Sequence, residues 1–364
     1  MNIMDFLPEI VSIIFDYSNI NDVISFIRSY KIDKEIQKIF YLRLFKKYND
    51  LDIICNSKYI DLTYVKFIDK FNPKCTDNAM DYAAHNGHLE VVQWLHYKSI
   101  TESDRYKGCT AWAMDGAAKH GHIEVVQWLH NNCKEGCTIW AMNYAAVNGH
   151  IEVVQWLHNN RKEGCTSLAM DSAAKYGHLE IVQWLHNKSI TESDRYDGCT
   201  IYAMDNAACN GHLEILKWLY YNRKEGCTIY AMDNAACNGH LEILKWLYYN
   251  RKEGCTIWAM NDAAANGHLD VVKWLYEKYI TKSNRNDDCI HTVIYYAAQN
   301  GHLDVVKWLC ERYFTVFNEY NNYVLDIMAH AVENNHQNIV EWLKQWCCEN
   351  DQNNTIMNLS EQKN

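Results

Sequence analysis

Two short apolar stripes alternate along most of the chain, and residues 137–164 show both of them. After Thr138, a residue suited to capping a helix start, the first stripe consists of Ala141, Met142, Ala145 and Ala146. Gly149 then predicts a helix end, where a positive φ is needed. The second stripe follows at once, over 151–157, and ends in the polar segment 158–164. The pattern therefore predicts a pair of antiparallel helices.

This pattern repeats with a fixed period. A Gly-His pair between the two stripes recurs every 28 or 34 residues, at Gly87, Gly121, Gly149, Gly177, Gly211, Gly239, Gly267 and Gly301. Residues 199–226 recur without change as 227–254. Neither helix of one repeat could bury its stripe alone, so we expect about ten repeats, over residues 49–348, to stack into one core. In the 34-residue repeats we expect longer loops at 97–108, 187–198, 277–288 and 309–322.

One tryptophan recurs on the second stripe of successive repeats. The row consists of Trp94, Trp128, Trp156, Trp184, Trp218, Trp246, Trp274, Trp308 and Trp342. These residues share a stripe with Val and Leu that must be buried, which predicts a packing ladder. An exposed aromatic rail for bases or sugars is the alternative.

The segment Ala-Ala-His-Asn-Gly-His-Leu-Glu-Val-Val at 83–92 resembles the ankyrin repeat, whose helices carry an Ala-Ala pair, Asn-Gly-His and Leu-Glu-Val-Val. The resemblance implies an all-α, ankyrin-like helical repeat solenoid that binds protein partners. The chain lacks the Thr-Pro-Leu-His opening, and its 28-residue repeats are shorter than the usual period of about 33. In this respect the repeats are similar to those of giant DNA viruses and protists.

Residues 1–48 do not fit the repeat and predict a small N-terminal helical domain. Its opening, Leu7-Pro8-Glu9-Ile10 followed by Ile14, resembles an F-box, although the residue between Pro and Glu is missing. That resemblance implies that Leu7, Pro8, Ile10 and Ile14 contact a Skp1-like protein of a cullin ubiquitin ligase. The alternative is a cap that covers the apolar end of the stack. At the other end, the polar composition of residues 349–364 predicts a disordered tail.

Composition narrows the classes of partner and compartment. A net charge of −10 and a pI near 5.9 argue against nucleic-acid binding. The sequence has no apolar run long enough to cross a membrane and no secretory signal at its start, so we expect no membrane partner and an intracellular, cytoplasmic location, in a host cell if the protein is viral. We also expect a monomer.

The cysteines and histidines do not form a catalytic or metal-binding motif in the sequence. One cysteine recurs at a single repeat position, at Cys75, Cys109, Cys137, Cys165, Cys199, Cys227, Cys255 and Cys289. Equivalent residues of stacked helices lie too far apart for disulfides, so we expect free thiols in a reducing compartment. The Gly-His histidines are expected to make local hydrogen bonds at the turn. We therefore predict no enzymatic activity, no catalytic or cofactor-binding residue and no metal site.

Binding residues are expected where repeats vary on a constant scaffold. The residue before Ala-Met and the residue after the following Asp or Asn both vary, and both include aromatic residues, which are typical interface anchors. The predicted contact residues of the array are Tyr82, Trp112, Trp140, Tyr144, Tyr202, Tyr230, Trp258 and Tyr296. Packing between repeats is the alternative for the Trp112 row. By resemblance, these positions belong to the first helices, which line the concave side of ankyrin stacks.

Two functions agree with this reading of the sequence. The first is a non-enzymatic adaptor that binds a protein through the array and, if residues 1–48 are F-box-like, serves as a substrate receptor of an SCF-type ubiquitin ligase. The second is a scaffold or sequestering protein with no link to ubiquitin ligases.

Overall fold

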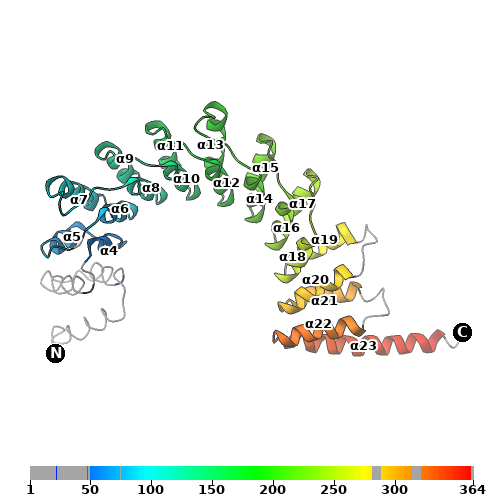
Figure 1. The fold of residues 1–364 in the computed structure, drawn as a ribbon. Coiled ribbons are helices and arrows are strands. Elements are labelled where there is room, and N and C mark those ends of the chain that lie inside the picture. Colours follow the sequence, from blue (N-terminus) through cyan, green and yellow to red (C-terminus); the bar gives the residue numbers. More distant parts are fainter. Residues whose placement is uncertain are drawn as a thin grey trace, which may run out of the picture. The chain divides into compact units, whose positions relative to one another are not determined.

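A computed structural model describes residues 50–73, 75–280, 288–313 and 321–361, together with Asp22 and Lys47. The chain divides into two compact units, Met1–Cys199 and Thr200–Asn364, and each is described by itself. Throughout the described ranges the regular elements are helices that follow one another in pairs, without a β-strand (Figure 1). The predicted all-α repeat solenoid is confirmed. The residues of the F-box-like segment, Leu7, Pro8, Ile10 and Ile14, lie outside the described residues.

Five helix pairs make up the described part of the first unit. They are α4 (Leu51–Cys55) with α5 (Leu62–Asp69), α6 (Asp77–His85) with α7 (Leu89–Thr101), α8 (Ala111–Lys119) with α9 (Ile123–Asn132), α10 (Ile139–Val147) with α11 (Ile151–Asn160), and α12 (Ser167–Lys175) with α13 (Leu179–Thr191). The first helix of each pair lies beside the first helix of the next pair, and the second helices lie beside one another (Figure 1).

The second unit repeats this arrangement. Its pairs are α14 (Tyr202–Cys209) with α15 (Leu213–Asn222), α16 (Ile229–Cys237) with α17 (Leu241–Asn250), α18 (Trp258–Ala265) with α19 (Leu269–Leu275), α20 (Asp288–Gln299) with α21 (Leu303–Tyr313), and α22 (Asn321–Glu333) with α23 (Gln337–Glu361). A turn of π-helix, η2 (Tyr276–Ile280), follows α19. Helix α23 includes most of the polar segment 349–364, for which we expected disorder, and no Gly or Pro interrupts it.

The core of each unit lies between the paired helices. Ala145 and Ala146 of α10 are fully buried, and so are Val153, Val154 and Leu157 of α11, to within 1%. The small alanines let first helices of adjacent repeats approach closely, while each Val or Leu contributes about 1.5–3 kcal/mol by leaving water. The same positions are buried in the neighbouring repeats, so the apolar stripes join into a continuous core within each unit.

In several repeats an aspartate on the first helix connects the repeat to the next one. Asp115 accepts hydrogen bonds from the backbone N–H (2.9 Å) and the hydroxyl (2.6 Å) of Thr138, and Asp81 does the same with Thr110. The Thr138 hydroxyl in turn accepts from the N–H of Trp140 at 3.1 Å and so caps α10. Asp205 and Asp233 repeat the contact in the second unit.

The Gly-His turn also connects repeats. The backbone N–H of His150 donates locally at the turn to the carbonyl oxygen of Ala145 at 2.9 Å, as expected, but the imidazole rings of this row contact the preceding repeat. His178 Nε2 lies 3.2 Å from the carbonyl oxygen of Val147, and His88 Nε2 lies 2.8 Å from that of Ser57, each in the preceding repeat. The ring of His178 covers Gly149, where an added Cβ would lie 2.7 Å from the ring. Gly149 is therefore required twice, by this close approach and by its φ of 82°.

The extra residues of two 34-residue repeats form longer loops, as expected, but they also lengthen the preceding helix. They extend α7 and α13 to 13 residues each, against 10 in α9, and the loop that follows α7, over 102–110, is longer than the loop over 133–138 that follows α9. These longer loops fold back onto the array. Tyr196 is 2% exposed and its hydroxyl lies 2.6 Å from His158 Nδ1. An isolated β-bridge joins it to Cys165, whose N–H donates to the carbonyl of Arg195 at 3.0 Å. The insertion thus covers the end of the neighbouring repeat.

The tryptophan row of the second helices packs between repeats but is not fully buried. Trp156 is half-buried, and the ring of His130 in the preceding repeat meets it edge-on at a centroid distance of 5.2 Å. His158 contacts Trp184, and Tyr248 contacts Trp274, in the same way. The packing ladder is the better description of these rings, although the row also keeps an edge in solvent. No helix within the described ranges is long and apolar enough to cross a membrane.

Candidate protein-binding face

The first turn of the first helices carries a row of exposed aromatic residues. The exposed side chains lie directly before the buried Ala-Met pair, at Trp112 (67% exposed) and Trp140 (42%) in the first unit, and at Tyr202 (60%), Tyr230 (59%) and Trp258 (53%) in the second. Ala113 and Met114 face the core, so the residue before them is turned away from it. We name this set the first-turn row.

The sequence left open whether the residues of the first-turn row pack between repeats, and their exposure argues against such packing. A residue that packs between repeats would lose most of its surface to its neighbours, as Ala113 does at 1% exposed. The first-turn row instead leaves large apolar surface in water. That arrangement is common at protein interfaces, where Trp and Tyr are the usual anchors.

The second predicted set lies one helical turn further along and is half-buried. Tyr82, Tyr144 and Tyr296 all keep part of their surface. Tyr144 stacks on Trp140 with a centroid distance of 5.2 Å and an interplanar angle of 24°. Tyr296 contacts Trp258 at 6.4 Å. The structure therefore brings the two predicted sets together in two aromatic pairs, Trp140 with Tyr144 and Trp258 with Tyr296.

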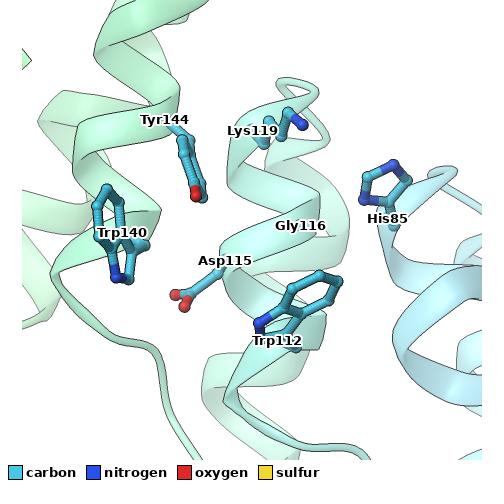
Figure 2. A pocket seen from close by; sticks show the side chains of 7 residues that line it. All are labelled: His85, Trp112, Asp115, Gly116, Lys119, Trp140 and Tyr144. Atoms are coloured by element: carbon cyan, nitrogen blue, oxygen red, sulfur yellow. The ribbon is translucent and has the colours of Figure 1, made fainter. Parts of the chain in front are cut away.

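A hollow of about 170 Å³ opens on this face in the first unit. It is lined by His85, Trp112, Asp115, Gly116, Lys119, Trp140 and Tyr144 (Figure 2). Gly116 stands where the other clear repeats have Tyr, Asn, Ser or Asp, so the missing side chain leaves room between the two tryptophans. A Cβ at Gly116 would also lie 3.1 Å from the His85 ring.

The polar groups in the hollow are already engaged or neutral. Both carboxylate oxygens of Asp115 accept hydrogen bonds from Thr138, and burial raises the pKa of this carboxyl despite them. Burial and the nearby His120 lower the pKa of His85 to about 4, so its ring is neutral at pH 7. The Lys119 ammonium lies 5.6 Å from the Tyr144 ring.

These features suit the binding of an apolar side chain better than catalysis. The aromatic walls offer apolar contact, and the one carboxylate serves the connection between repeats. His85 was not among the predicted contact residues, and neither were Gly116 and Lys119. Gly116 was the signal in the sequence that could have indicated the hollow, because the other clear repeats have a larger residue at this position.

The cysteines of the repeated position from Cys75 to Cys255 form no disulfide. Burial raises the pKa of Cys137 and of Cys165 to about 12, so these thiols stay protonated near neutral pH.

Comparison with known proteins gives a family for this architecture. A model of ankyrin repeats in three copies matches residues 113–197, 170–261, 204–287 and 260–356, and a model of ankyrin repeats in many copies matches residues 49–96. A comparison with curated proteins returned no match.

Proposed function

The chain belongs to the ankyrin repeat family, whose arrays are protein–protein interaction modules, and we propose that it is a non-enzymatic adaptor that binds a protein partner through its first-turn row. The observation that carries this proposal is the exposure of Trp112 and Trp140 beside the hollow at Gly116. Large aromatic side chains with a neighbouring recess are the usual anchors of protein interfaces.

The recess and its rim indicate the kind of contact. Trp112, Trp140 and Tyr144 offer three aromatic faces, and the hollow between them can take one apolar side chain of the partner. Lys119 at the rim favours an acidic group close to that side chain. In the second unit, Tyr202, Tyr230 and Trp258 offer a similar series of exposed aromatic anchors.

The adaptor role divides into the two alternatives left open by the sequence. If residues 1–48 are F-box-like, Leu7, Pro8, Ile10 and Ile14 bind a Skp1-like protein, and the array presents its cargo to an SCF-type ubiquitin ligase. If they are a cap, the chain is a scaffold or sequestering protein. In either case we propose a monomer in the cytoplasm, where the free thiols of the array stay reduced.

The binding face can be tested by capture with matched variants. Full-length chain, the double variant Trp112→Ala plus Trp140→Ala, and the control Tyr97→Ala are immobilised in parallel, and bound proteins are compared by quantitative mass spectrometry. Tyr97 is 62% exposed but lies on a second helix. We expect a set of proteins that the control keeps and the double variant loses by at least ~10-fold, as for removal of a hot spot. Equal capture by all three chains would contradict the proposal.

The ligase alternative has its own test. The full chain and Leu7→Asp plus Ile10→Asp are purified with a Skp1-like protein, and co-elution is measured. Co-elution with the unmutated chain alone supports the F-box-like reading. If the Skp1-like protein does not co-elute with the unmutated chain, the ligase alternative is wrong and the scaffold alternative remains. This outcome would not contradict the proposal that the first-turn row binds a partner.

A further inference from the structure

One repeat departs from its neighbours in the polar segment after its second helix. Residues 161–164 read Arg-Lys-Glu-Gly, and residues 223–226 and 251–254 are the same. At 133–136 the segment reads Cys-Lys-Glu-Gly, so Cys133 stands where these repeats have arginine. The contacts of that arginine show what the substitution removes.

In the other repeats the arginine balances a carboxylate beside the repeated cysteine. Arg161 forms an ion pair with Glu163 through its guanidinium, and both groups act on the thiol of Cys137. Arg251 and Glu253 stand in the same relation to Cys227. The position next to the repeated cysteine and the glutamate is therefore normally filled by a cation.

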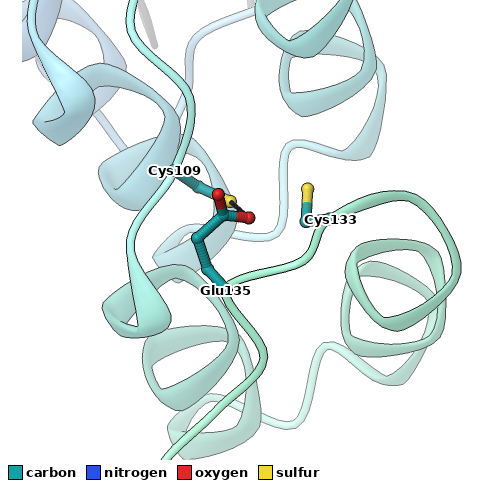
Figure 3. Close-up of side chains that lie close together, drawn as sticks. All are labelled: Cys109, Cys133 and Glu135. Carbon is teal, nitrogen blue, oxygen red and sulfur yellow. Dashed lines mark hydrogen bonds between the residues drawn. The ribbon is translucent and has the colours of Figure 1, made fainter.

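At Cys133 the cation is missing and its place is taken by a second thiol. Cys109, Cys133 and Glu135 converge there from two loops (Figure 3). Their ligand atoms all lie within 4.8 Å of one another, with Cys109 Sγ 3.9 Å from Glu135 Oε2. The groups that act electrostatically on the Cys109 thiol are Cys133, Glu135 and Asp81, each of which is neutral or negative.

A nitrogen ligand lies on the other side of Cys133. His96 of α7, in the preceding repeat, has its Nδ1 atom 3.7 Å from Cys133 Sγ. Two ligands bound at about 2.0–2.3 Å to one tetrahedral ion are themselves separated by about 3.5–3.8 Å. The separation of 3.7 Å between His96 and Cys133 lies within this range, and the separation of 3.9 Å between Cys109 and Glu135 lies just above it. His96 lies outside the group of three whose ligand atoms are all within 4.8 Å of one another, so its ring must move toward Cys109 and Glu135 to complete the tetrahedron.

We propose that Cys109, Cys133 and Glu135, with His96 as the fourth ligand, form a zinc site that joins two adjacent repeats. Thiolate, imidazole and carboxylate are all zinc ligands, and a pair of thiolates favours Zn²⁺ over Mg²⁺ or Ca²⁺. The ion replaces the guanidinium that the other repeats use. Binding displaces one proton from each thiol, so one Zn²⁺ enters and two protons leave.

The chain offers its own control, because Cys133→Arg restores the residue of the neighbouring repeats and should fold as they do. Metal-free full-length chain, kept reduced with a phosphine, is titrated with Co²⁺ and followed by absorption. We expect one equivalent to bind, with a thiolate-to-cobalt charge-transfer band that Zn²⁺ abolishes. Cys133→Arg should bind more weakly by at least on the order of 100-fold, and Cys209→Ser, which changes a thiol elsewhere, should bind like the unmutated chain.

Thermal unfolding gives a second readout that does not depend on the spectrum. Zn²⁺ should raise the melting temperature of the unmutated chain and leave that of Cys133→Arg unchanged, since an ion that binds only the folded state stabilises it. If Cys133→Arg fails to fold, Cys133→Ser takes its place in both measurements. Absence of the charge-transfer band in the reduced chain would overturn the proposal, as would an equal response from the variant. A disulfide between Cys109 and Cys133 without metal binding after reduction would overturn it too.

Discussion

The molecule uses the same aromatic residue types in two rows with different surroundings. In the second helices Trp156 is half-buried and meets His130 of the preceding repeat. In the first helices Trp112 and Trp140 leave 67% and 42% of their surface in water. Residue type alone therefore does not assign a role in a repeat array. The place of the residue relative to the apolar stripe decides whether a ring stabilises the stack or remains available to a partner.

The largest expected effect comes from breaking the second-helix row. Trp156→Ala should lower the free energy of unfolding by about 2–3 kcal/mol, less than the 3–5 kcal/mol typical of a fully buried Trp because part of the ring is already in solvent. Denaturant unfolding of full-length chain measures it. A loss below about 0.5 kcal/mol would place Trp156 with the exposed residues and remove the contrast between the rows.

Asp115, which connects two repeats, gives a second test of whether a residue stabilises the stack or serves the binding face. Asp115→Ala should cost about 1–3 kcal/mol, because the N–H and hydroxyl of Thr138 lose their buried partner. Asp115→Asn should cost less, since Asn143 already accepts from the N–H of Thr166 at 3.1 Å in the next repeat. Equal unfolding curves for the alanine variant and the unmutated chain would show that this connection carries no stability.

Acid should weaken the array through His85, a half-buried histidine that lines the hollow on the binding face. Burial lowers the pKa of His85 from 6.5 to about 4. Between pH 6.5 and pH 4 this histidine is therefore protonated in the unfolded chain and neutral in the folded chain. This contribution to stability is complete above pH 6.5 and is lost as the pH falls toward 4. Melting temperatures over this range should fall less steeply for His85→Gln. An unchanged slope in the variant would mean that His85 titrates normally.

The smallest expected effect belongs to the first-turn row. Trp112→Ala should change the free energy of unfolding by no more than about 0.5 kcal/mol, as is usual for a substitution on the surface. Its effect should appear in partner binding instead. A loss of stability similar to that of Trp156→Ala would indicate that Trp112 is a packing residue.

The sequence predicted the helices well because the apolar period and the Gly-His marker are local signals. It also predicted that the first-turn row is exposed, since the residue at this position varies among repeats whereas the core residues do not, but the second set of Tyr82, Tyr144 and Tyr296 is half-buried. It missed the hydrogen bonds between repeats. The bond from His178 to Val147 depends on how two turns meet in space, and a single repeat does not contain that information.

The two special sites on the array were missed for a related reason. The hollow at Gly116 needs Trp140 from the next repeat to close it. The cluster of Cys109, Cys133 and Glu135 joins residues 24 and 26 positions apart, a spacing that matches no familiar metal motif. The sequence shows that Arg161 occupies the position equivalent to Cys133. It does not show that this arginine forms an ion pair with Glu163, which is seen only in the structure.

Hydroxyl-radical footprinting of the full chain, alone and with the partner captured by the binding face, tests the distinction between the rows most directly. In the free chain we expect Trp112 and Trp140 to be oxidised faster than Trp156. In the complex, the rates at Trp112 and Trp140 should fall several-fold while the rate at Trp156 stays constant. Protection of Trp156 with no change at Trp112 and Trp140 would contradict the account, because the partner would then bind the second-helix row.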